Sequence, residues 1–149
     1  MLKSIDALLT PSQRWSRIAE LIFRVFTSLI FIIGGLGHFG RHQMMLDRMA
    51  GSPWRDTVNS IGDPSVLLWL SGAAFVVFGI ALALGFMTRL SALVILVTLI
   101  PITFFTHVAP GGTGPLFKNI AIMGALILLM AKGGGAYAID NRHAPYRAV

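Results

Sequence analysis

Two histidines, a lysine and an asparagine lie at the ends of long apolar segments and could bind a polar ligand. His38 closes the first segment and His107 closes the third, while Lys118 and Asn119 open the fourth. Neutral imidazole can relay protons or ligate a metal or haem, and ammonium and amide groups can donate hydrogen bonds to a polar head such as that of a quinone. The competing interpretation is that histidines at a membrane interface are simply hydrated. No acidic residue stands nearby in sequence to orient the imidazoles, so we expect no metal site and no haem.

Arg24 is a further candidate, because it lies inside the first apolar segment. One interpretation pairs it with Glu20, one helical turn away, while its guanidinium reaches back to the membrane surface. Long cations near helix ends usually do this, which favours the first interpretation. In the other, Arg24 faces the protein interior and holds a quinone oxygen, a lipid head group or a carboxylate of a partner.

The elements that must position these residues are four long apolar segments, over about 18–37, 66–87, 90–106 and 115–131. Of the 149 residues, 55% are hydrophobic and only 12% are charged, whereas soluble domains carry about 25% charged residues. Each segment is close to the roughly 20 residues that cross a bilayer as a helix, and none shows the period-two alternation of barrel strands. We therefore predict an all-α fold, a four-helix transmembrane bundle that forms a single domain over residues 1–149.

The distribution of Lys and Arg predicts the orientation of the bundle. One side of the membrane receives both tails and the tight turn between the second and third segments, and the other receives the remaining two loops. The counts are seven against three, which places both termini in the cytoplasm and the long loop outside. Topology thus accounts for the net charge of +6, and we expect no nucleic-acid partner. The first side holds Lys3, Arg14, Arg17, Arg89, Lys132, Arg142 and Arg147, and the long loop holds Arg41, Arg48 and Arg55.

This topology places three candidate residues at the external end of the bundle. The first and third segments run outward and end in His38 and His107, and the fourth begins there with Lys118. Neighbouring helix axes in a bundle lie only about 8–10 Å apart, so side chains at one depth can meet. We predict that the three residues line one pocket.

The long external loop carries signals for short helical pieces. Ser52 and Asp63 each precede a proline, an arrangement typical of helix starts. Residues 41–50 show helical spacing, and Gly51 and Gly62 are natural stops.

Several classes of site are excluded or disfavoured. The chain has no cysteine, so it contains no disulfide, thiolate metal site or thiol relay. Residues 35–40 match the dinucleotide pattern G-x-G-x-x-G, but they close a membrane segment instead of joining a strand to a helix. The glycines there, like the small residues of the second segment, favour close approach between helices.

The chain carries several short motifs in order: Arg24, the GGLGHF run, GFMTRLSAL between the second and third spans, His107, the triplet Phe117-Lys118-Asn119, and Gly133-Gly134-Gly135 followed by Ile139-Asp140. In this order they resemble the DoxX family of small four-helix bacterial membrane proteins. Two departures accompany the resemblance: the family often has Lys where this chain has His38, and often has Glu in the second span before the glycine that matches Gly79.

The resemblance implies a multi-pass protein of the bacterial inner membrane that serves a quinone-linked or oxidative-stress-related redox system. If the protein takes part in catalysis, it does so as an oxidoreductase subunit, with quinone as the candidate cofactor. A membrane-protein partner or a second copy of the chain is expected in addition to the lipid bilayer. The expected ligand contacts are His38, His107, Lys118 and Asn119, with Arg24 ranked lower.

Two other functions remain open. One is a non-catalytic accessory or assembly subunit that packs against a larger membrane complex, which suits the charge-free, Gly- and Ala-rich second span. The other is a small transporter, against which stands the scarcity of polar residues within the spans.

The predicted orientation can be tested by labelling with a membrane-impermeant thiol reagent. Because the native chain has no cysteine, Asn59→Cys in the long loop reports on that loop alone. We expect labelling in intact cells. Labelling that requires opened membranes would contradict the orientation.

Overall fold

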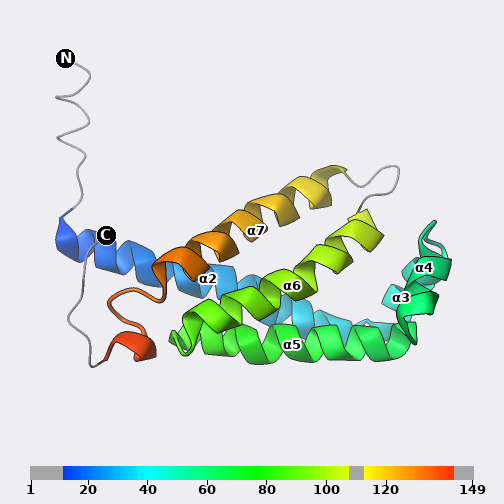
Figure 1. Ribbon diagram of the computed structural model, residues 1–149, viewed down its shortest axis with the longest axis horizontal. Coiled ribbons are helices and arrows are strands. Elements are labelled where there is room, and N and C mark those ends of the chain that lie inside the picture. Colours follow the sequence, from blue (N-terminus) through cyan, green and yellow to red (C-terminus); the bar gives the residue numbers. More distant parts are fainter. Residues whose placement is uncertain (1–11, 108–112, 143–149) are drawn as a thin grey trace, which may run out of the picture.

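The computed structural model describes residues 12–107 and 113–142, and these residues form helices and turns without strands. Figure 1 shows two long helices, α2 and α5, lying along one another, with α6 and α7 inclined across them. This confirms the predicted all-α class. The helices are α2 (Gln13–Gly40), α3 (His42–Ala50), α4 (Arg55–Ile61), α5 (Pro64–Leu84), α6 (Thr88–His107) and α7 (Thr113–Lys132), followed by a short 3-10 turn, η1 (Ile139–Asn141).

Within the described ranges, four helices are long and apolar enough to cross a membrane: α2, α5, α6 and α7. They coincide with the four predicted segments, and α2 extends beyond its segment at both ends. The predicted second segment reaches too far, since α5 stops at Leu84. Gly85 ends it with a left-handed backbone (φ 70°) and its N–H bonds back to the last turn, the usual glycine-terminated helix end.

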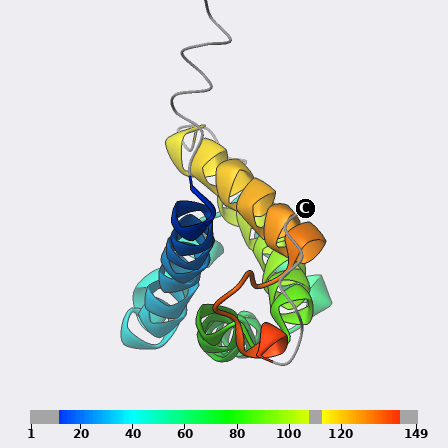
Figure 2. The same ribbon diagram turned by 90° about the vertical axis from the view of Figure 1, so that its left-hand side faces the viewer.

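The four spans associate as two pairs, α2 with α5 and α6 with α7, and α5 packs on α6 to join them. The end-on view in Figure 2 shows this pairing. Side chains from α5, α6 and α7 meet in the common core, where Leu82, Ile95 and Leu126 are fully buried. The bundle is therefore built from two hairpin-like halves and not from four equivalent contacts.

The α2–α5 contact depends on glycine. A Cβ atom on Gly72 of α5 would lie 2.8 Å from the His38 Cβ and 3.2 Å from the Gly35 carbonyl oxygen on α2. The two backbones approach more closely than any side chain there would allow, as the small residues predicted. Phe31 and Phe75 pack beside this contact with ring centroids 5.2 Å apart.

The long loop folds as the helices α3 and α4, which lie at one end of the bundle (Figure 1). Asp63 caps α5 as predicted, because its Oδ1 accepts the N–H groups of Ser65 and Val66 at 2.7 and 3.2 Å. The prediction that a helix starts at Ser52 is wrong, since α4 begins at Arg55. The Ser52 hydroxyl instead donates to the Phe105 carbonyl of α6 at 3.3 Å, and so holds the loop to the bundle.

Replacing Gly72 by Ala should force α2 and α5 apart and destabilise the protein. Overpacking of this kind costs about 1–3 kcal/mol, which should appear as a lower thermal midpoint of the protein in nanodiscs. Gly34→Ala is the matched control, because a Cβ there meets nothing within 4 Å and alanine favours the helix. Equal midpoints for the two variants would contradict this account of the interface.

Candidate functional site

Arg24 lies in the interior of the bundle and binds backbone carbonyl groups of its own chain. Its side chain is only 1% exposed. Nε donates to the Ala83 carbonyl at 3.3 Å, Nη2 donates to the Tyr137 carbonyl at 3.3 Å, and Nη1 donates to the Gly134 carbonyl. The interpretation in which Arg24 reaches back to the membrane surface is therefore wrong. The planar guanidinium can serve carbonyls from two separate segments at once, which makes it suited to this position.

The segment after α7 forms a strap, residues 133–142, that crosses the end of the bundle opposite α3 and α4 (Figure 1). Ala138 in its middle is buried, at 2% exposure. A side chain on Gly134 could not fit, because a Cβ there would lie 2.4 Å from the Ala138 Cβ and 2.6 Å from Thr88 Oγ1. The strap is thus packed tightly between Arg24 and the start of α6.

Asp140 of the strap caps α6 from outside that helix. Its Oδ1 and Oδ2 accept the N–H groups of Met87 and Thr88, each at 2.8 Å. Partial burial raises the pKa of Asp140, but the hydrogen bonds from Thr88 and Met87 and the charge of Arg24 outweigh it, so the pKa lies below its usual value. The carboxylate is therefore ionised at neutral pH, where it complements the positive end of the α6 dipole.

His38 faces α5, where it is 8% exposed. Its Nδ1 lies 3.0 Å from Ser71 Oγ and 3.3 Å from the Leu68 carbonyl oxygen. The Ser71 hydroxyl donates its own proton to the Leu68 carbonyl. Its oxygen can therefore accept a hydrogen bond from a protonated His38 Nδ1. One turn later, His42 Nε2 lies 2.9 Å from Ser65 Oγ. Its buried Nδ1 has no hydrogen-bond partner within the part of the chain that the structure describes.

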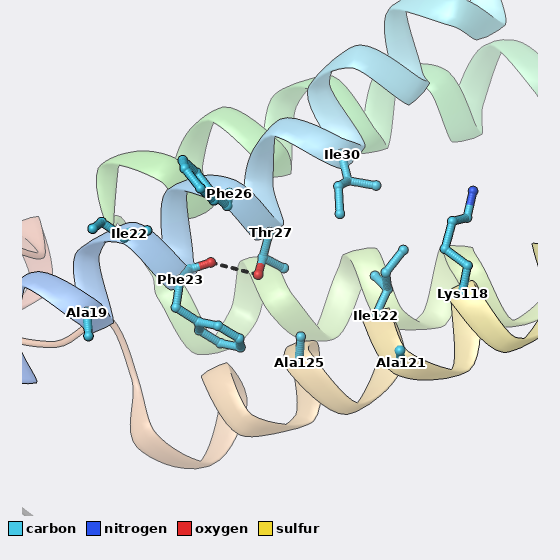
Figure 3. Close-up of a pocket in the computed structure, with 10 residues that line it drawn as sticks. All are labelled: Ala19, Ile22, Phe23, Phe26, Thr27, Ile30, Lys118, Ala121, Ile122 and Ala125. Atoms are coloured by element: carbon cyan, nitrogen blue, oxygen red, sulfur yellow. Dashed lines mark hydrogen bonds between the residues drawn. The ribbon is translucent and has the colours of Figure 1, made fainter. Parts of the chain in front are cut away.

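Asn119 and Lys118 are neighbours in sequence but face different surroundings. Asn119 is 5% exposed and its Nδ2 donates to Thr103 Oγ1 at 2.9 Å, which ties α7 to α6. Lys118 is exposed and projects from α7 into a groove between α7 and α2 (Figure 3).

This α2–α7 groove has a volume of about 620 Å³ and an almost wholly apolar wall. Among the described lining residues, Lys118 is the only charged one, and the Thr27 hydroxyl on the wall already donates to the Phe23 carbonyl at 2.7 Å. The wall consists of Ala19, Ile22, Phe23, Phe26, Thr27 and Ile30 from α2 and Lys118, Ala121, Ile122 and Ala125 from α7.

Those predicted candidates whose side chains the structure describes are therefore not gathered in one place. His38 packs on α5, Asn119 packs on α6, and Lys118 alone lines the α2–α7 groove. His107 is the last residue of α6, and its side chain lies outside the described residues. Over the described ranges, no group of three His, Asp or Glu side chains could hold a metal ion.

Sequence reasoning missed Asp140 as a capping residue and missed the carbonyl groups as the partners of Arg24. One signal could have indicated the cap: Asp140 is the only acidic residue after Asp63. Nothing in the sequence marks individual backbone carbonyls.

Arg24→Ala should leave three carbonyl groups without donors in the interior. Each buried, unsatisfied group costs about 1–3 kcal/mol, partly offset because a charge is no longer buried, so we expect a loss of about 2–4 kcal/mol in unfolding free energy. Arg24→Lys should recover only part of it, because an ammonium cannot span both segments. Thermal unfolding in nanodiscs measures both.

Arg14→Ala is the control, since Arg14 is an exposed arginine on the same helix and should be close to neutral. An Arg24→Ala protein as stable as the Arg14→Ala protein would contradict the structural role assigned to the buried guanidinium.

Comparison with known proteins gives consistent relationships. The DoxX family model matches residues 19–108. An uncharacterized protein of Haemophilus influenzae is 32% identical over 127 residues, covering 80% of this chain and 86% of that protein. The inner membrane protein YqjF of Escherichia coli is 29% identical over 127 residues, covering 83% of this chain and 91% of that protein. No solved structure matches the chain significantly. With its four apolar helices, the chain belongs to the DoxX family of multi-pass inner-membrane proteins.

Proposed function

We propose that this protein is a membrane subunit of a quinone-linked redox system and that it binds the quinone head at Lys118. The observation that carries the proposal is the position of Lys118, a cation on the wall of an otherwise apolar groove in a membrane protein. A volume of about 620 Å³ is within the range of small-molecule sites, which combine apolar walls with a few polar groups.

The groove fits the chemistry of a quinone. The Lys118 ammonium can donate a hydrogen bond to a quinone carbonyl oxygen, and in apolar surroundings such a bond is stronger than in water. None of the lining residues that the structure describes is acidic, so none of these competes for the ammonium. The quinone would supply the capacity to accept and release electrons and protons, while Lys118 would hold and orient its head.

The other predicted contacts take a lower rank in this proposal. The His38 imidazole and the Asn119 amide already have hydrogen-bond partners on α5 and α6, and Arg24 is committed to carbonyl groups. His107 remains a proposed contact because it ends α6 next to the start of α7 in sequence. We further propose that the strap end of the bundle faces the cytoplasm, on the strength of the Lys and Arg distribution.

One structural feature favours the alternative, a non-catalytic accessory subunit. Three buried polar side chains of the spans, Arg24, His38 and Asn119, hold helices together. A protein whose interior polar groups are spent on its own fold is suited to packing against a larger complex, with a membrane protein or a second copy as partner. Purification without quinone but with a stable partner would favour this function.

The proposal predicts that Lys118→Gln weakens quinone binding about tenfold. Loss of one hydrogen bond to a charged group is worth about 1.5–3 kcal/mol, and tenfold corresponds to about 1.4 kcal/mol. Binding can be measured by cross-linking a photoreactive, decyl-tailed benzoquinone to the protein in nanodiscs. Lys118→Arg should retain most of the binding, because it keeps the charge.

Lys132→Gln is the matched control, since Lys132 is exposed on the same helix and does not line the groove. Cross-links that map outside α2 and α7, or equal binding by the Lys118→Gln and Lys132→Gln proteins, would reject the site. Absence of saturable cross-linking in the native protein would reject the proposed function itself.

A further inference from the structure

The α2–α7 groove is long and has a polar group at one end only. Figure 3 shows Lys118 beside Ile30 at one end of the groove and Ala19 at the other. The eleven residue steps from Ala19 to Ile30 correspond to about 16 Å along α2, at a rise of 1.5 Å per residue. A molecule that fills the groove therefore needs a compact polar head and a slender apolar remainder.

The two walls of the groove differ in bulk. On α7, Ala121 and Ala125 follow Lys118 along the same helix face, at spacings of three and seven residues. On α2, the Phe23 ring points toward α7 near Ala125, whereas Phe26 is turned away from α7 (Figure 3). The alanines therefore keep open a space that larger residues on α7 would fill against the Phe23 ring.

Beyond Lys118, the described part of the wall has no side chain with a free hydrogen-bonding group. Thr27 is the remaining polar residue of the lining, and its hydroxyl is bound to the Phe23 carbonyl within its own helix. This part of the groove can bind hydrocarbon, with a favourable free energy in proportion to the apolar area covered, but it cannot bind a polar group specifically.

We propose that the groove seats the isoprenoid tail of the quinone, which runs from Lys118 toward Ala19, and that Ala121 and Ala125 determine specificity for this tail. The inference rests on the proposed function, because it takes the quinone head at Lys118 as its starting point. We take a quinone tail as the occupant because the groove offers one head contact, Lys118, and one line of alanines, whereas a phospholipid carries two acyl chains behind a charged head.

The test compares two probes on four proteins in nanodiscs: the native chain, Ala121→Leu, Ala125→Leu and Ala73→Leu. The probes are a benzoquinone with a short isoprenoid tail and the same benzoquinone with a methyl group in place of the tail, each corrected for partition into protein-free nanodiscs. Ala73→Leu is the matched control, because Ala73 is exposed on α5 and does not line the groove.

We expect the native protein to bind the tailed probe at least tenfold more tightly than the tail-less one. Ala121→Leu and Ala125→Leu should each remove most of that advantage and leave binding of the tail-less probe unchanged, while Ala73→Leu should behave like the native chain. The thermal midpoints of Ala121→Leu and Ala125→Leu should differ from that of the native protein by no more than the midpoint of Ala73→Leu does. This result would show that the variants fill the groove without damaging the fold.

The outcomes that overturn the inference differ from those that overturn the proposed function. Equal affinity for both probes in the native protein, or an equal loss in all three leucine variants, rejects the tail site but keeps quinone binding. If a phospholipid co-purifies in the groove and neither probe displaces it, the tail site is also rejected and the groove is a lipid-binding site. Failure of both probes to bind rejects the proposed function as well.

Discussion

The arrangement of the bundle depends on one constraint: the charged guanidinium of Arg24 lies in an apolar helix and has to be satisfied inside the protein. The Ala83 carbonyl, one of its acceptors, belongs to the last turn of α5, where carbonyl groups have no partner within the helix and carry the negative end of the dipole. The Gly134 and Tyr137 carbonyls come from the strap. Arg24 thereby completes the end of α5 and holds the strap in place.

The start of α6 is completed in the complementary way. Asp140 of the same strap accepts the Met87 and Thr88 N–H groups, so the turn between α5 and α6 is bound by a cation on one side and an anion on the other. The two pairs of helices are fixed to each other at this end. Elsewhere, α2 packs on α5 at the Gly72 contact, and α7 is bound to α6 through Asn119. Because each helix packs on a different partner, α2 and α7 do not pack closely against each other, and the groove lies between them.

Hydropathy and capping residues predicted the spans, the short helices of the long loop and the start of α5, because these depend on local sequence. The surroundings of Arg24, His38 and Lys118 could not be predicted, since composition does not determine how each helix is rotated about its axis. General experience with long cations favoured the membrane surface for Arg24, and it was wrong here because the acceptors are carbonyls of residues more than fifty positions away in sequence. Lys118 and Asn119 lie at similar depth, but adjacent residues on a helix point in different directions, so the two side chains have different neighbours.

The place of the groove affects what kind of affinity the proposed ligand would need. The groove lies between two membrane-spanning helices, so a hydrophobic ligand reaches it from the bilayer and not from water. The apolar tail of such a ligand has already left water before it binds. Contact with the wall therefore adds binding free energy only where the tail packs more closely against the protein than against lipid. Discrimination therefore has to come from the single hydrogen bond at Lys118 and from shape along Ala121 and Ala125. A site of this kind binds weakly relative to the bilayer and exchanges quickly, as the quinone proposed above would have to do between redox cycles.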